Sequence, residues 1–380
     1  MKTTITPAQI SQTNLKLIYQ YIYQRESVSQ QDIAYALRLS RPTVSAKVNE
    51  LEEHGLIRKA GQISSELAGR KAAAYSVVPD YRVAVGVEVM KKLFKVLIVD
   101  LKGQYYHRKV YEVHYENTQS YIQNLCETVN RYIESLPYTQ EQILGVGFSF
   151  QGLVNAEGTR ITYGKILDCT GLTIDSFSRW LHYPCRFLHD AAAAADSELW
   201  ASPELSDFIY MNISIHLGAT IIHDRKILPG KHGYSGTIEH IQIVPNGKKC
   251  YCGRQGCIET VCSMNALLGE DEEDTFFEKK EAGDPAVMER WRTYLYYLAL
   301  SINNMHLLYN EDFVLGGYLA SRLYDADLAC ICENIEKLSP FPENIDYIHV
   351  SKMPKHIITI GAALPYIRNF LAGELIPMKG

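Results

Sequence analysis

Three cysteines and a histidine fall within eighteen residues of this chain, from His240 to Cys257. Cys250 and Cys252 open the segment Cys-Tyr-Cys-Gly-Arg-Gln-Gly-Cys, whose two glycines allow the tight turns that wrapping a small ion demands. Zinc takes four tetrahedral nitrogen and sulfur ligands, so these four residues complete a closed shell with no position for an activated water. We therefore predict a structural zinc ion that folds the loop. The alternative is a loop of reduced cysteines without metal, and Cys262 is a substitute candidate for one ligand position.

Length and composition predict a protein of several domains in the cytoplasm. The 380 residues exceed what one hydrophobic core normally holds, which favours two or three domains. No charged-then-apolar leader opens the chain, and no run approaches the eighteen apolar residues of a membrane span. Nine cysteines, an odd number with one tight cluster, fit reduced thiols and a metal site better than a disulfide framework. We expect a soluble cytoplasmic protein without a membrane partner.

Charge is divided unevenly along the chain. Residues 1–80 hold ten Lys and Arg against seven Asp and Glu, a balance of +3. The remaining residues hold 28 against 36, a balance of -8. A basic head on an acidic body indicates a polyanionic partner for the head alone.

Residues 1–80 carry the periodicity of a winged helix-turn-helix domain. A stripe at helical spacing predicts a first helix packed on one face, formed by Leu15, Ile18, Tyr19 and Ile22. Ser29 and Ser40 are placed to cap a second and a third helix. Gly55 ends the third helix, and the strand after it begins a wing that closes near the basic tip Gly69-Arg70-Lys71.

The third helix of this head is predicted to read DNA. The hundred-degree step between helical residues turns Ser45, Ala46 and Asn49 outward. Small outward side chains let a helix approach base edges in the major groove, where asparagine can bond adenine twice, while basic and hydroxyl groups hold phosphates. The predicted DNA contacts are Ser40, Arg41, Thr43, Ser45, Lys47, Asn49, Arg70 and Lys71. The alternative is a trihelical protein-interaction module whose charges are only solvated.

Residues 81–380 are predicted to form a two-lobed α/β body. Strands are expected at 83–89, 94–100, 104–113 and 143–150, with a helix near 118–135. A similar alternation returns with strands near 208–215, 220–223 and 313–315 and a helix near 285–309. Two lobes, about 81–190 and 191–380, with a ligand cleft between them follow from this repeat. Residues 75–80 are interpreted as the junction to the head.

Over nearly its whole length the chain resembles the ROK family, which contains sugar-responsive repressors and sugar kinases on an actin-like fold. The resemblance is carried by Cys-x-Cys-Gly-x-x-Gly-Cys-x-Glu at 250–259 with His240 ten residues ahead, by Gly145-Val146-Gly147, and by Leu188-His189-Asp190 before four alanines. The head indicates the repressor branch, because the family's kinases resemble the body alone. The resemblance implies an α/β fold with a winged helix-turn-helix before a two-lobed actin-like domain. It also implies a repressor of carbohydrate-metabolism genes that binds double-stranded operator DNA as a homodimer or tetramer.

The phosphate loops of the family decide whether kinase activity is expected. Family kinases hold ATP with D-x-G-G-T and G-T-G-x-G loops, whose glycines let backbone N-H groups approach the phosphates. These loops fall here on residues 88–92 and 214–218, which keep only Gly218. Asp190 matches the kinases' general base, but a base without a bound phosphoryl donor transfers nothing. We expect no enzyme activity; the alternative is a sugar kinase with an accessory head.

The resemblance also implies a sugar effector in the cleft. Asp190 and Glu259 match family sugar contacts, and His240 can orient a hydroxyl while its other nitrogen holds zinc. A family glutamate is replaced by Thr237 and an asparagine by His189, while Glu239 replaces a glycine and is expected to point elsewhere. The expected effector contacts are His189, Asp190, Thr237, His240 and Glu259. The alternatives are carboxylates that only brace the fold, and a body that docks another protein and binds no small molecule.

Overall fold

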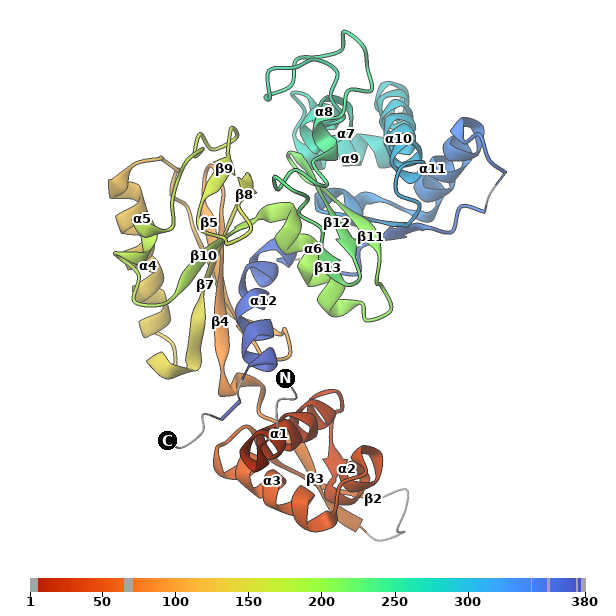
Figure 1. Ribbon diagram of the computed structural model, residues 1–380. Helices are drawn as coiled ribbons and strands as arrows, with labels where there is room; N and C mark the ends of the chain where they lie inside the picture. The colour runs from red at the N-terminus through yellow and green to blue at the C-terminus, as the bar shows by residue number, and fades with distance from the viewer. Residues whose placement is uncertain (1–5, 65–70, 343, 354–355, 374, 377–380) are drawn as a thin grey trace.

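A computed structural model of the protein describes residues 6–64, 71–342, 344–353, 356–373 and 375–376 (Figure 1). A small N-terminal domain, the head, precedes two α/β lobes, each built on a five-stranded sheet. None of the described helices combines the length and the apolar character that crossing a membrane requires.

The head is a three-helix domain closed by a three-stranded sheet. Its elements are α1 (Pro7–Tyr23), β1 (Val28–Ser29), α2 (Gln30–Leu37), α3 (Arg41–Glu53), β2 (Ile57–Ser64) and β3 (Lys71–Val77). The predicted stripe of α1 is buried, and the two predicted caps are formed. Ser29 Oγ accepts the Asp32 N-H and Ser40 Oγ accepts the Thr43 N-H, both at 3.2 Å. The winged helix-turn-helix prediction is confirmed, although residues 65–70 at the wing tip lie outside the described residues.

The junction between head and body lies later than predicted. Tyr75 and Val77, expected to begin the junction, belong to β3 and pair with Val28 of β1 and Ile57 of β2. Both side chains are buried in the core of the head, and this burial fixes them there rather than in a linker. The connection is instead the short 3-10 helix η1 (Pro79–Tyr81) before β4.

The first lobe is a mixed sheet in the order β10-β7-β4-β5-β6. Its strands are β4 (Val83–Val89), β5 (Phe94–Asp100), β6 (Tyr105–Tyr111), β7 (Ile143–Phe150) and β10 (Cys185–His189). Helices α4 (Gln119–Glu134) and α5 (Asp175–Ser178) and the hairpin of β8 (Leu153–Val154) with β9 (Ile161–Tyr163) complete it. Because β4, β7 and β10 run parallel, their carboxyl ends open on one edge, where a ligand cleft is expected.

The second lobe repeats the plan with the order β13-β12-β11-β14-β15. The strands are β11 (Phe208–Ile213), β12 (Leu217–His223), β13 (Lys226–Ile227), β14 (Asp312–Gly316) and β15 (Ile348–Val350). The helices are α6 (Asp190–Ala201), α7 (Glu259–Cys262), α8 (Met264–Leu268), α9 (Glu273–Glu281), α10 (Pro285–His306) and α11 (Asp325–Leu338), with the 3-10 turns η3 (Ile238–His240) and η4 (Tyr318–Arg322). A single apolar core joins the sheet to α10 and α11.

The last helix, α12 (Ile357–Ala372), returns to the first lobe and corrects the expected lobe boundary at residue 190. It packs on β4, β5 and β7 and crosses α6, as Figure 1 shows. Glycines permit this approach, because a Cβ on Gly86 would lie 1.8 Å from the Thr359 carbonyl and one on Gly361 would lie 1.8 Å from the Ala193 carbonyl. The apolar face of α12 packs on the first sheet. The predicted boundary, which assigned every residue after 190 to the second lobe, was therefore wrong for this helix.

The chain after α12 reaches into the head. Leu375 and Ile376 are 5% and 6% exposed and belong to the apolar core that α1, α2 and α3 enclose. On the same side, the Tyr23 hydroxyl donates to the Leu101 carbonyl at 2.6 Å. The head is therefore packed against the body and not merely tethered to it.

Candidate functional site

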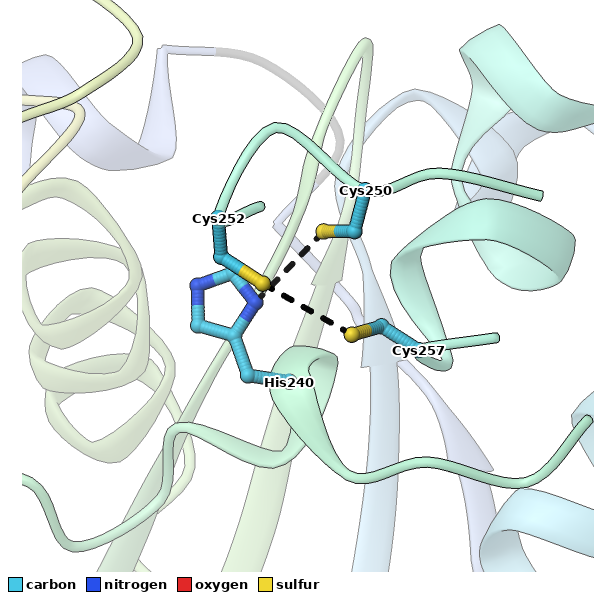
Figure 2. Close-up of side chains that lie close together, drawn as sticks. All are labelled: His240, Cys250, Cys252 and Cys257. Carbon is cyan, nitrogen blue, oxygen red and sulfur yellow. Dashed lines mark hydrogen bonds between the residues drawn. The ribbon is translucent and has the colours of Figure 1, made fainter. Parts of the chain in front are cut away.

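Four candidate metal ligands converge in the loop between η3 and α7. His240 Nδ1 lies 3.7 Å from Cys250 Sγ, and Cys252 Sγ lies 3.7 Å from Cys257 Sγ (Figure 2). All four ligand atoms lie within 4.8 Å of one another. Sulfur atoms in a tetrahedral zinc shell with bonds of about 2.3 Å stand about 3.8 Å apart, so the spacing fits this ion. It is too long for a disulfide, whose sulfurs are about 2.05 Å apart.

The loop backbone and the histidine's charge state also suit a metal. Gly256 has a φ of +71°, and a Cβ there would lie 1.7 Å from the Val244 carbonyl, so the turn requires glycine. Burial, and then the nearby Arg254 guanidinium, lower the pKa of His240 and favour the neutral imidazole that binds metal. Cys262, the substitute candidate, lies in the core with its Sγ 3.6 Å from Ser301 Oγ and does not join the cluster.

The cleft between the lobes contains a polar cavity beside this loop. About 460 Å³ of space, part of it open to solvent, separates β10 and the β8–β9 hairpin from η3 and the start of β12. The polar side chains on its wall are Gln151, Tyr163, Lys165, His189, Asp190, His216, Glu239, His240 and Tyr251. Three of the five expected effector contacts, His189, Asp190 and His240, are thus brought together.

Asp190 lies in the cleft because it directly follows β10 and begins α6. Its Oδ1 accepts the Ala191 N-H at 2.8 Å and lies 3.3 Å from His189 Nε2. Burial raises the pKa of Asp190 and lowers that of His189. An aspartate and an imidazole side by side can accept and donate hydrogen bonds to one hydroxyl group.

Glu239, which was expected to point elsewhere, lies on the cavity wall, and Thr237 does not. Glu239 is 5% exposed, and its Oε2 has no hydrogen-bond partner among the described residues. Burial raises the pKa of Glu239 to about 8. A metal cation bound to the adjacent His240 would lower this pKa, because a nearby positive charge favours the ionised carboxylate. The Thr237 hydroxyl instead donates to the Tyr234 carbonyl at 2.8 Å. Thr237 precedes the 3-10 turn, and this hydrogen bond holds its hydroxyl away from the cavity wall.

Glu259 corrects a second expectation, because it lies behind the cavity wall rather than on it. Its Oε1 accepts from His216 Nδ1 at 2.7 Å, and its Oε2 accepts the Leu217 N-H at 2.8 Å. Both oxygens are therefore occupied in holding the start of β12. His216 reaches the cavity in its place, a residue that sequence reasoning treated only as part of a lost phosphate loop.

His240 connects the metal cluster with the cleft. Its Nδ1 belongs to the cluster, while its Nε2 lies 4.0 Å from Glu239 Oε1 on the cavity wall. Tyr251, between two of the cysteines, packs edge-on against both His240 and His216. A change in the loop therefore moves groups that line the cavity.

A second cavity adjoins the polar one on the side of α12. It encloses about 690 Å³, part of it open to solvent, and shares Gln151 and Asp190 with the polar cavity. Both degenerate phosphate loops contribute to its wall, through residues 88–90 and 214–215. Lys95 Nζ lies 3.3 Å from Glu88 Oε2, which also accepts the Thr359 hydroxyl at 2.9 Å.

The predicted DNA contacts divide into exposed and partly buried side chains. On α3, Arg41 and Asn49 are exposed, whereas Thr43, Ser45 and Lys47 are half-buried. Lys47 Nζ lies 2.6 Å from Glu50 Oε2, and the Ser40 and Thr43 hydroxyls are 2.8 Å apart at the cap.

Ala46 and Asn49 are exposed as expected, but Ser45 is only half-exposed, because three helical residues place it about 60° around the axis from the buried Val48. Arg70 lies outside the described residues, as does the side chain of Lys71, which begins β3.

Two family sequence models match parts of the chain. The sequence model of the ROK family matches residues 84–364, and that of the MarR family matches residues 10–60. A xylose repressor of Caldicellulosiruptor bescii is 25% identical over 263 residues, covering 68% of this chain and 66% of the relative. An N-acetylglucosamine repressor of Escherichia coli O157:H7 is 27% identical over 264 residues, covering 68% and 64%. The chain thus spans about two thirds of the length of these relatives.

Solved structures agree with the fold. A ROK family transcriptional regulator, a homologue of the E. coli MLC protein, superposes with a TM-score of 0.75 at 22% identity, covering 95% of this chain and 96% of that one. A ROK family glucokinase from Streptomyces griseus, in complex with glucose and AMPPNP, superposes with a TM-score of 0.66 at 19% identity, covering 74% and 98%. The predicted fold class is confirmed.

Proposed function

Because the chain belongs to the ROK family and joins its body to a winged helix-turn-helix head, we propose that it is a DNA-binding transcriptional repressor controlled by a sugar effector. The main support for this proposal is that one chain combines two surfaces. An exposed face of α3 bears Arg41 and Asn49, and a cleft in the body is lined by Asp190 and three histidines. Relatives named xylose repressor and N-acetylglucosamine repressor support the same function.

The head would bind operator DNA with α3 in the major groove. Asn49 is exposed near the middle of the outer face, where an amide can bond adenine bidentately. Arg41 is exposed in the first turn and can reach a phosphate. Because Lys47 is paired with Glu50, we assign it a smaller role than Arg41. A homodimer would place two such helices on half-sites about one helical turn, or a multiple of it, apart.

The effector would bind in the polar cavity. Sugar hydroxyls are recognised by a few placed donors and acceptors, and Asp190, His189 and Glu239 supply both kinds. His189 belongs to β10 of the first lobe, whereas His216, held by Glu259, and His240 add two imidazoles beside Glu239 on the second lobe. Since the contacts come from both lobes, a bound sugar would favour one degree of lobe closure over another.

Closure would reach the DNA-binding head through α12. His356 and Ile357, at the start of this helix, line the second cavity. At its other end Phe370 packs on Tyr81 of the junction, and Leu375 and Ile376 enter the core of the head. A helix in contact with both regions offers a direct route between them.

We assign the cysteine cluster to a structural zinc ion. His240, Cys250, Cys252 and Cys257 would hold it, and with four protein ligands it would supply folding energy to the loop. The loop then fixes Tyr251 and His240 against the polar cavity. Support comes from ligand spacing and from glycines in positive-φ turns.

The proposed function excludes phosphoryl transfer. Bulky side chains of Met90 and Ile215 occupy the loops that would have to present bare backbone to phosphates, and Lys95 is paired with Glu88. Family kinases share this fold, so the exclusion depends on these residues and not on the architecture.

One experiment separates the candidate functions. Genomic fragments selected by the full-length protein are tested in gel shifts with and without a panel of sugars, and the same panel is tested for ADP release from MgATP. Selective DNA binding that a sugar weakens, without ADP release, is expected. Sugar-dependent ADP release would identify a kinase with an accessory head. Selective DNA binding that no sugar alters would favour control by protein docking, and the lack of selective binding would reject the repressor.

A further inference from the structure

The second cavity has an apolar wall that the recognition of sugar hydroxyls does not require. It begins where β4 and β7 end and extends under the first turn of α12. Six of its sixteen lining residues carry apolar side chains, namely Val89, Met90, Ile215, Met353, Ile357 and Ile358. A ligand that buries against such a wall gains from removing apolar surface from water.

Among these side chains, Ile215 gives the strongest indication of an apolar ligand group. It is 45% exposed at the mouth of the cavity, in the loop between β11 and β12. The next residue, His216, lines the polar cavity instead, so consecutive side chains face the two cavities. An isoleucine exposed beside an apolar recess is stabilised when a ligand covers it.

The charges on this wall do not suit an anion. Glu88 and Asp190 both contribute carboxyl groups to it. Among the described lining residues Lys95 is the one ammonium group, and its Nζ is already 3.3 Å from Glu88 Oε2. A phosphate group would meet two acids and no available Lys or Arg partner, which disfavours sugar phosphates and nucleotides there.

The two cavities adjoin, since Asp190 and Gln151 line both of them. We propose that the effector is a glycoside, with its sugar ring in the polar cavity and a neutral, apolar aglycone in the second. Asp190 then stands beside the glycosidic linkage. Ser149 Oγ, buried on the second wall without a partner among the described residues, can donate to an oxygen of the linkage or the aglycone. This inference rests on the proposed sugar-sensing function and adds the class of effector.

Matched ligands test the aglycone directly. Methyl and 4-nitrophenyl glycosides of xylose, glucose and N-acetylglucosamine, in both anomeric forms, are titrated into the full-length protein by calorimetry. In at least one pair the aryl glycoside is expected to bind tenfold or more tightly, about 1.4 kcal/mol. Ile215→Ser should remove most of that advantage and leave the methyl glycoside unchanged. Ile227→Ser, at an exposed apolar position on β13 away from the cavity, is the matched control.

The outcomes separate this inference from the function on which it rests. Equal affinities within every pair, or equal weakening of both glycosides by Ile215→Ser, would overturn the aglycone site and leave the sugar sensor intact. Binding of MgATP in competition with the aryl glycoside would assign the cavity to a nucleotide and overturn the inference as well. If no glycoside of either kind bound, the inference would be rejected, and the sugar-sensing function would be rejected as well if no free sugar altered DNA binding in the gel shifts.

Discussion

Glu259 holds His216 from behind the wall of the polar cavity, with Oε1 of the carboxylate 2.7 Å from Nδ1 of the imidazole. The same carboxylate accepts the Leu217 N-H, so it fixes both the side chain and the backbone at the start of β12. Because Glu259 follows Cys257 by two residues, the cysteine loop and the polar cavity share one support.

Replacing Glu259 is expected to weaken effector binding without removing the metal. Glu259→Gln leaves at least one of the two hydrogen bonds impaired, at a cost of about 1–3 kcal/mol in unfolding free energy. Effector affinity measured by calorimetry should fall tenfold or more, while zinc content stays at one equivalent. Glu278→Gln, at an exposed carboxylate on α9, should change neither. Unchanged effector affinity in Glu259→Gln would show that His216 needs no such anchor.

Loss of one cysteine ligand should release the metal and loosen the loop. We expect Cys257→Ser to retain less than half an equivalent of zinc and to melt at a lower temperature, because a structural zinc site contributes folding energy. Metal analysis and thermal denaturation measure both effects. Cys332→Ser, outside the cluster on α11, serves as the control. Freshly purified wild-type protein with little zinc and fully titratable cluster thiols would contradict the assignment.

The outer face of α3 should carry operator affinity. Arg41→Ala should weaken binding to all DNA sequences alike. The slope of log affinity against log salt concentration should fall in magnitude by about one, the contribution of one phosphate contact. Asn49→Ala should cost about 1–3 kcal/mol and relax sequence preference at one position. Gel shifts at two salt concentrations measure both, with Arg131→Ala on α4 as a charge-matched control. Wild-type affinity in both head variants would reject this orientation of the helix.

The contact of the residues after α12 with the head should couple effector binding to DNA binding. Ile376→Ala removes buried apolar contact with the head, where large-to-small changes cost about 2–5 kcal/mol. Effector binding to the body should persist, but its effect on DNA affinity, measured by fluorescence anisotropy, should shrink. Phe341→Ala, at a side chain 62% exposed, should leave the coupling intact. Full coupling in Ile376→Ala would exclude this route.

No transfer from ATP to a sugar is expected from the wild-type chain or from Met90→Gly. A single glycine restores bare backbone at one point of a loop that lacks several, and phosphoryl transfer depends on positioning every group. A coupled ADP-release assay over a hexose panel measures this, with a ROK glucokinase as the positive control. Sugar-dependent turnover above the assay background would refute the non-enzymatic assignment.

The helices of the head and most strands of the body were predictable because their signals are local. The stripe from Leu15 to Ile22, the Ser40 cap and the cysteine spacing each depend on residues close in sequence. Periodicity and capping act within one or two turns, so reading them requires no knowledge of the remainder of the chain. Even Tyr75, misplaced in the junction, lies within three residues of the true end of β3.

The composition of the cleft was decided by tertiary structure. Sequence determined that Asp190, His240 and the cysteines are present, but only the packed fold showed that Glu239 faces the cavity, that Thr237 turns away and that Glu259 serves His216. The return of α12 to the first lobe and of Ile376 to the head joins residues some 270 and 350 positions apart. Such contacts arise because apolar faces are buried wherever they fit, and that fit is a property of the whole chain rather than of any segment.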